Sequence, residues 1–72
     1  MEQQLNILVG KKIKELRIAS GFSQEALADQ AEIHRSHLGE IERGEVDIRI
    51  SQLMKVAEVL GVKVSKLVQG IA

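Results

Sequence analysis

Apolar positions recur along most of the chain at the three- and four-residue spacing of an amphipathic helix. In the first such stretch, residues 5–20, the positions Leu5, Val9, Ile13 and Leu16 lie on one helical face. A glycine follows directly, which is common at the C-terminal end of a helix. The pattern therefore predicts a first helix over these residues.

Further stretches with helical spacing follow, and Gly44 and Gly61 each come after one of them. The predicted helices cover residues 24–31, 35–43, 50–60 and 65–69. Ser23 is a good N-cap for the second helix, because its hydroxyl can accept a bond from a free backbone N–H. Alternation with a period of two is confined to residues 46–50 and 62–64, which are too short to outweigh the helical pattern. The predicted fold class is all-α, with five short helices.

Length and composition fit a small globular protein. The chain has 72 residues, of which 44% are hydrophobic and 28% charged, so residues 1–72 are expected to form one domain. The absence of cysteine excludes disulfides and thiolate metal sites. No apolar run approaches the about 20 residues that cross a bilayer. The first residues lack the basic and apolar blocks of a signal peptide, so a cytoplasmic protein is expected.

Charge and aromatic content exclude several function classes. Ten Lys and Arg balance ten Asp and Glu, which argues against a generically basic nucleic-acid coat protein. Phe22 is the single aromatic residue, which argues against proteins that stack single-stranded bases on aromatic rings. No nucleophile–base pair or phosphate-cradling glycine loop is present, and a substrate cavity is hard to build at this length. An enzyme is therefore not expected.

Residues 24–43 carry the most specific information. Two short helices joined by a turn of about three residues must cross closely, and Ala28 supplies the small side chain that such a crossing needs. Apolar residues suited to the shared core are Leu27, Ala31, Ile33, Leu38 and Ile41. The second of these helices then presents a polar face outward. Such a helix fits the major groove of DNA in diameter and hydrogen-bonding chemistry.

Four blocks in this chain resemble the helix-turn-helix family of the lambda-repressor and Cro type, also called the xenobiotic-response-element family. They are K-x-I-K-E-L-R at 11–17, S-Q-E-A-L-A at 23–28, H-R-S-H-L-G-E-I-E-R-G at 34–44 and L-x-x-V-A-x-x-L-G-V at 53–62. The resemblance covers residues 9–68. Two positions depart from the family pattern: Glu32 replaces the usual Gly of the turn, and Ile48 replaces a frequent Pro. A left-handed backbone at Glu32 would cost roughly 1 kcal/mol.

The resemblance implies that the front of the third helix reads DNA bases. Arg35, Ser36 and Glu40 are the expected base contacts. Arginine can bind guanine through two hydrogen bonds, and glutamate can accept one from cytosine N4. Alternatives remain for each residue: a phosphate contact for Arg35, a helix-capping hydroxyl for Ser36 and a solvated acid for Glu40. Gly39 would let the helix approach DNA closely.

Contacts to the DNA backbone are expected at Ser23, Gln24, His37, Arg43 and Arg49. Gln24 begins the second helix, where free N–H groups favour a phosphate. The alternative for the last two arginines is a mixed solvated loop, because Glu45 and Asp47 lie between them. His34 is expected to begin the third helix. No metal site is expected, because two histidines and Glu40 fall short of the four ligands that zinc takes.

Two further features are expected to hold the protein together. The resemblance implies a partly buried ion pair between Arg17 and Glu42, which would fix the first helix to the third. Residues 62–72 are too apolar for a free surface end and are expected to contribute to dimerisation. The residues concerned are Val62, Val64, Leu67, Val68 and Ile71. The alternative is that this segment covers the core of a monomer.

The expected function is a sequence-specific DNA-binding transcriptional regulator that binds a palindromic operator as a homodimer, without cofactor or small-molecule ligand. The short controller proteins of restriction–modification systems are the most similar members. A phage-type repressor, an antitoxin or a protein-interaction module without DNA binding are the alternatives. The balanced charge does not exclude DNA binding, because Glu15, Asp29 and Glu58 can lie away from the DNA. It does predict weak non-specific binding.

Overall fold

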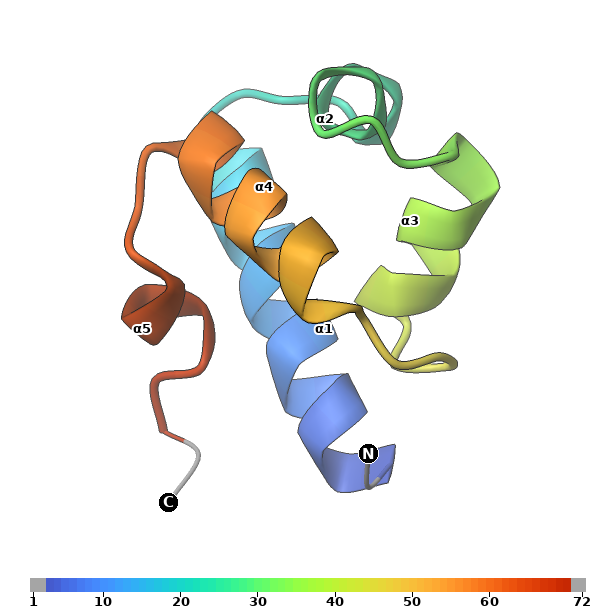
Figure 1. Cartoon of the computed structure of the whole chain (residues 1–72), viewed down its shortest axis with the longest axis vertical. Coiled ribbons are helices and arrows are strands. Elements are labelled where there is room, and N and C mark those ends of the chain that lie inside the picture. The colour runs from blue at the N-terminus through green and yellow to red at the C-terminus, as the bar shows by residue number, and fades with distance from the viewer. Residues whose placement is uncertain (1–2, 71–72) are drawn as a thin grey trace.

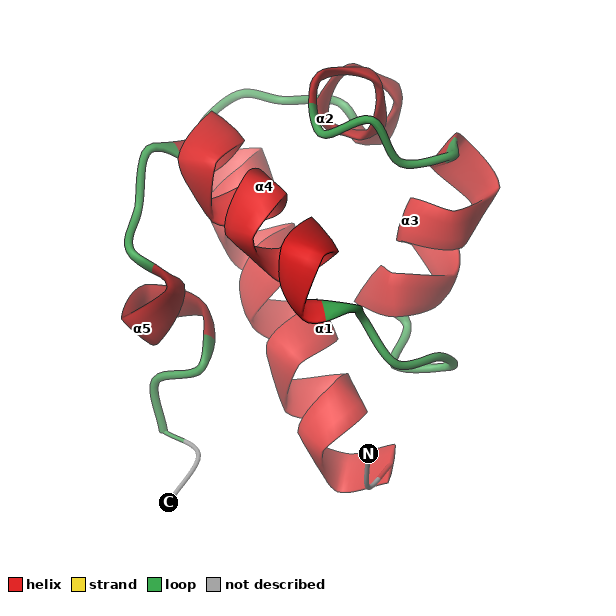
Figure 2. Ribbon diagram, viewed as in Figure 1, coloured by secondary structure: helices red, strands yellow, loops and turns green. Residues whose placement is uncertain are grey.

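The computed structural model describes residues 3–70 and contains five α-helices (Figure 1). They are α1 (Gln3–Ala19), α2 (Gln24–Gln30), α3 (Arg35–Glu42), α4 (Ile50–Leu60) and α5 (Val64–Leu67). The described residues contain no strand (Figure 2), so the predicted all-α class is confirmed. The bounds of α4 match the prediction, and the other helices begin and end within two residues of it. None of the helices within residues 3–70 has the length and apolar character needed to cross a membrane.

The five helices pack around a single apolar core. α1 packs against α3, α4 and α5, and α2 packs against α3 and α4. In Figure 1, α3 and α5 lie on opposite sides of the domain. The buried apolar residues come from all five helices and from the turn between α2 and α3. They are Val9, Ile13, Leu27, Ala28, Ala31, Ile33, Leu38, Ile41, Val56, Ala57, Leu60 and Leu67.

The placement of Leu67 in a dimer surface is wrong. Its side chain is 1% exposed and belongs to the core of the single chain. For this residue the alternative holds, namely that the C-terminal segment covers the core of a monomer. Val62, Val64 and Val68 pack against the same core but are only partly buried. Ile71 lies outside the described residues. The C-terminal segment therefore closes the core with one side and leaves part of its apolar surface exposed.

The turn between α2 and α3 has the backbone that favours glycine. Glu32 has φ +58°, in the left-handed region, at the position where the family usually has Gly. The turn is closed by the N–H of Ile33, which donates to the carbonyl oxygen of Ala28 at 2.9 Å. The Glu32 carboxylate lies 3.6 Å from Lys55 Nζ on α4. Packing around the turn therefore holds a conformation that costs a glutamate roughly 1 kcal/mol.

The close crossing of α1 and α3 depends on Gly10, which the hydrophobic pattern does not single out. This residue is buried in the middle of α1. A Cβ at this position would collide with the carbonyl oxygen of Ile41 and would lie 2.9 Å from that of Glu42. Both obstacles are backbone atoms, which cannot swing aside as a flexible side chain can. Only glycine therefore lets the two helices approach as they do.

Candidate nucleic-acid interface

The two helices of the helix-turn-helix are each capped by a side chain. Ser23 Oγ accepts a bond from the N–H of Ala26 at 3.0 Å, so the predicted N-cap of α2 is confirmed. His34 is the N-cap of α3, and its Nδ1 accepts a bond from the N–H of Ser36 at 3.3 Å. Ser36 Oγ lies 2.8 Å from the same nitrogen. The Ser36 hydroxyl is thus part of the helix start while its residue remains exposed.

A surface hollow of about 400 Å³ lies between the start of α2 and the outer side of α3. It brings together the three expected base contacts with two of the expected backbone contacts. Its lining residues are Gln24, His34, Arg35, Ser36, Gly39, Glu40 and Arg43. Ser23, His37 and Arg49 do not line it. The hollow is open and most of its lining residues carry polar or charged groups, which suits contact with a large partner better than enclosure of a small ligand.

Gly39 shapes this hollow through its neighbours in the same chain. A Cβ at this position would lie 3.1 Å from Arg43 Nη1 and 3.6 Å from Gln24 Oε1. Both are the ends of flexible side chains. The missing side chain therefore makes room for Gln24 and Arg43 to lie over α3, in addition to any clearance it gives to DNA.

The ion pair between Arg17 and Glu42 is present and nearly enclosed. Arg17 Nε donates to Glu42 Oε2 at 2.7 Å, and Nη2 donates to Oε1 at 3.1 Å. The exposed fractions of the two side chains are 11% and 2%. Gln24 Nε2 adds a third bond to Glu42 Oε1 at 3.1 Å, and Arg17 Nη1 donates to the Phe22 carbonyl at 3.0 Å. This network joins α1, α2 and α3 directly beneath the hollow.

Gln24 also has a hydrogen-bond partner within the protein, which the sequence pattern does not indicate. Its amide nitrogen bonds the buried Glu42 carboxylate, while the same side chain lines the hollow. The bond to Glu42 therefore fixes the orientation of the Gln24 side chain. A phosphate at the start of α2 would meet a side chain that is already held in place.

Acidic side chains lie against the cations of the outer surface. Arg43 donates to Glu45 through Nε at 2.9 Å and through Nη2 at 3.2 Å. These bonds and the charge of Arg43 hold the pKa of the Glu45 carboxyl below its usual value, and the same contact raises the pKa of Arg43. Arg35 Nη1 lies 3.6 Å from Glu25 Oε2 on α2. Sequence reasoning missed this last pair, because ten positions separate its members.

The remaining candidates lie around the hollow. His37 Nδ1 lies 3.5 Å from Glu40 Oε1, one turn along α3. Arg49 is exposed at the start of α4, where its N–H donates to Gln52 Oε1 at 3.2 Å. Within residues 3–70, no group of three His, Asp or Glu side chains is arranged to hold a metal ion.

Comparison with known proteins shows to which family this chain belongs. A helix-turn-helix family model matches residues 13–67, which is more than half of the chain. The chain belongs to the helix-turn-helix family. This is a non-enzymatic class of DNA-binding transcription regulators. The family assignment made from the sequence motifs is confirmed.

Restriction–modification controller proteins are among the most similar relatives. The chain is 33% identical over 64 residues to control protein C.BamHI of Bacillus amyloliquefaciens, covering 88% of this chain and 79% of the relative. The crystal structure of the controller protein C.AhdI from Aeromonas hydrophila matches with a TM-score of 0.84 and 34% identity. That match covers 86% of this chain and 94% of the other.

A solved complex with DNA also has this fold. The structure of SinR, a master regulator for biofilm formation, in complex with DNA matches with a TM-score of 0.80 and 37% identity. The match covers 85% of this chain and 98% of the other. The helix-turn-helix family thus includes a close structural neighbour of this chain that has been crystallised on DNA.

Proposed function

We propose that this helix-turn-helix protein reads a specific operator by placing α3 in the major groove. The observation that carries the proposal is the hollow between α2 and α3, which gathers Arg35, Ser36 and Glu40 with Gln24 and Arg43. Three of these side chains can bond base edges. The other two are the proposed contacts to the phosphates that flank a helix in the groove.

Base and backbone contacts have separate roles in this proposal. Arg35 is 65% exposed in its side chain, so it can turn away from Glu25 and toward O6 and N7 of a guanine. Ser36 and Glu40 follow on the same helix and reach neighbouring bases. The backbone contacts that fix the position of α3 are Ser23, Gln24, His37, Arg43 and Arg49. Phosphate contacts of this kind set register and affinity, whereas base contacts set sequence preference.

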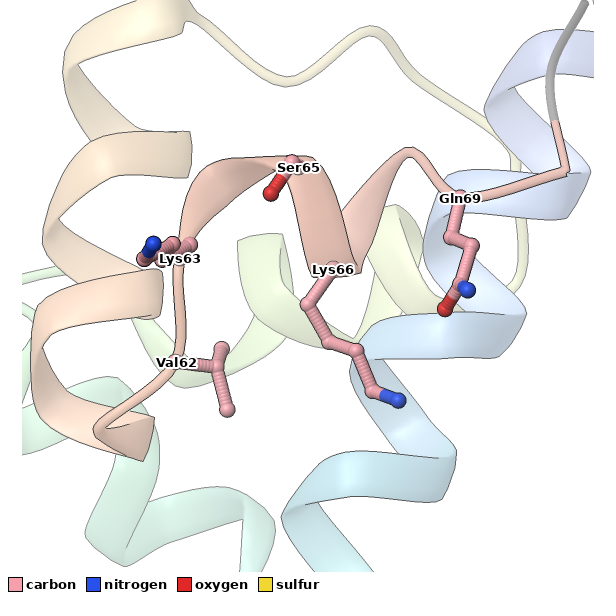
Figure 3. A pocket seen from close by; sticks show the side chains of 5 residues that line it. All are labelled: Val62, Lys63, Ser65, Lys66 and Gln69. Carbon is pink, nitrogen blue, oxygen red and sulfur yellow. The ribbon is translucent and has the colours of Figure 1, made fainter.

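The proposed regulator is a homodimer on a palindromic operator. Val62, Val64 and Val68 keep part of their apolar surface exposed. A hollow of about 530 Å³ on the same segment is lined by Val62, Lys63, Ser65, Lys66 and Gln69 (Figure 3). Association through residues 62–72, Leu67 excepted, would cover this surface. The domain measures 29 × 22 × 20 Å. Two such domains related by a two-fold axis can present their α3 helices about 34 Å apart, one turn of DNA.

Within this class, we favour a controller protein of a restriction–modification system. The support is the similarity to C.BamHI and C.AhdI, which extends over most of this chain and most of theirs. Neither a cofactor nor a small-molecule effector forms part of the proposal.

Replacing Arg35 by Ala tests the reading role of α3. We expect operator binding to weaken about 10- to 100-fold, because a bidentate contact to guanine is lost, while binding to random DNA changes little. Fluorescence anisotropy at one fixed salt concentration measures both. Lys12→Ala is the control, since it removes an equal charge from a surface pair with Glu15 on α1. Operator binding that survives Arg35→Ala would contradict the proposed recognition helix.

A further inference from the structure

On the outer surface of the helix-turn-helix, two arginines each lie beside a carboxylate of the same chain. Arg35 of α3 faces Glu25 of α2 at 3.6 Å. Arg43, which follows α3, faces Glu45 at 2.9 Å. Both arginines line the hollow, and both acidic partners are more than half exposed. Two of the three guanidinium groups that the proposed function assigns to DNA, those of Arg35 and Arg43, are therefore paired with carboxylates of the same chain.

The geometry of the second pair matches that of a phosphate contact. Glu45 accepts two parallel bonds, from Nε and Nη2 of Arg43. An arginine presents this same two-nitrogen edge to a phosphate or to a guanine. One guanidinium edge cannot bind both partners at once. DNA must therefore displace the Glu45 carboxylate before Arg43 can bond a phosphate by this edge.

We propose that Glu25 and Glu45 are internal competitors for DNA, each occupying an arginine that the nucleic acid must take over. This inference rests on the proposed function, and it names two residues that determine affinity and specificity without touching a base. In the free protein the carboxylates neutralise the surface that meets DNA. Non-specific binding is thereby kept weak.

The salt dependence of binding follows from the same exchange. An arginine that neutralises a phosphate releases a condensed counterion, which steepens the fall of affinity with salt. A carboxylate that loses its arginine regains a cation from solution, which offsets that release. Each competitor therefore makes the log–log salt slope about one unit shallower than its arginine alone would give. An exposed ion pair of this kind changes an equilibrium constant by up to about fivefold.

Three glutamate-to-glutamine variants test the proposal with equal changes of charge. They are Glu25→Gln, Glu45→Gln and the control Glu58→Gln, whose residue pairs with Lys55 at 3.9 Å on α4. We expect Glu45→Gln to tighten binding to operator and random DNA alike, by about two- to fivefold, with a slope steeper by about one. Glu25→Gln should tighten operator binding more than random binding, because Arg35 reads bases. The control should change neither affinity by more than about 1.5-fold.

Removal of each arginine separates competition from simple repulsion of DNA. The gain from Glu25→Gln should disappear in an Arg35→Ala background, and that from Glu45→Gln in an Arg43→Ala background. Gains no larger than the control's, or gains that persist without the arginine, would overturn the proposal. If the unmodified protein binds its operator and only the acid variants fail to gain, the competitor role alone is rejected. If the unmodified protein selects no DNA site, the proposed function is rejected and this inference with it.

Discussion

Replacing Glu42 by Gln is expected to lower the free energy of unfolding by about 3 kcal/mol. The substitution removes the charge that compensates Arg17, which is 11% exposed in its side chain and cannot turn to solvent without breaking its bond to the Phe22 carbonyl. Breaking a buried ion pair from one side typically costs about 3–5 kcal/mol, because the other charge stays buried. A domain of this length has a total stability of roughly 4–11 kcal/mol. Urea denaturation followed by circular dichroism measures the loss.

The control for Glu42→Gln is the same substitution in an ion pair that is exposed to water. Glu58→Gln breaks an exposed pair with Lys55, so we expect a change of less than about 0.5 kcal/mol. Arg17→Lys keeps the charge but not the two-nitrogen edge, and should fall between the two variants. An unchanged melting temperature for Glu42→Gln would show that the network does not fix α1 to α3.

Replacing Gly10 by Ala is expected to destabilise the fold by about 2–3 kcal/mol. Alanine is the better helix former by about 1 kcal/mol, so propensity alone predicts the opposite sign. The added methyl group would meet the carbonyl oxygens of Ile41 and Glu42, and α1 and α3 would have to separate. The same separation would lengthen the bonds between Arg17 and Glu42. Thermal denaturation of the purified variant gives the sign and the size.

Gly39→Ala is the matched control for this prediction. Gly39 is also a buried helical glycine, but the atoms nearest to its Cβ would be the end of the Arg43 side chain at 3.1 Å and that of Gln24 at ordinary contact distance, and not backbone. We expect this variant to be as stable as the parent or more stable, by up to about 1 kcal/mol. Equal effects of Gly10→Ala and Gly39→Ala would contradict the close approach assigned to Gly10.

Most of the fold can be predicted from the sequence, because its helices carry local signals. Apolar spacing defines the buried faces, and glycines with positive φ end α1 and α4 near where the chain predicts. Ser23 caps α2 as its residue type suggests. The pair of Arg17 and Glu42 follows from the family resemblance, since neither residue stands out by composition.

Other features depend on how the helices cross and have no local signal. The apolar pattern at residues 62–72 is the same whether a side chain closes the core or faces a partner, so it does not reveal that Leu67 is buried in the core. The role of Gly10 emerges only when α3 lies against it. The contact of Glu25 with Arg35 requires the turn between α2 and α3. Ile18 is 59% exposed, and nothing in the structure explains it.

The balanced charge of the chain has a structural explanation in these pairs. Glu42 is neutralised inside the fold by Arg17, and Glu58 lies beside Lys55 on α4. Glu25 and Glu45 lie against the arginines of the outer surface. A zero net charge is therefore compatible with DNA recognition, but it removes much of the long-range attraction. Affinity must then depend on base contacts and on two domains binding together.

Selection of bound sites from random double-stranded DNA tests whether this protein recognises a palindromic operator as a homodimer. The unmodified protein is used at a fixed salt concentration, and its oligomeric state is measured in parallel by sedimentation. We expect enrichment of an inverted repeat, with half-site centres about 10 base pairs or a multiple of this apart, bound by a dimer. Failure to enrich any inverted repeat would rule out recognition of a palindromic operator by this chain.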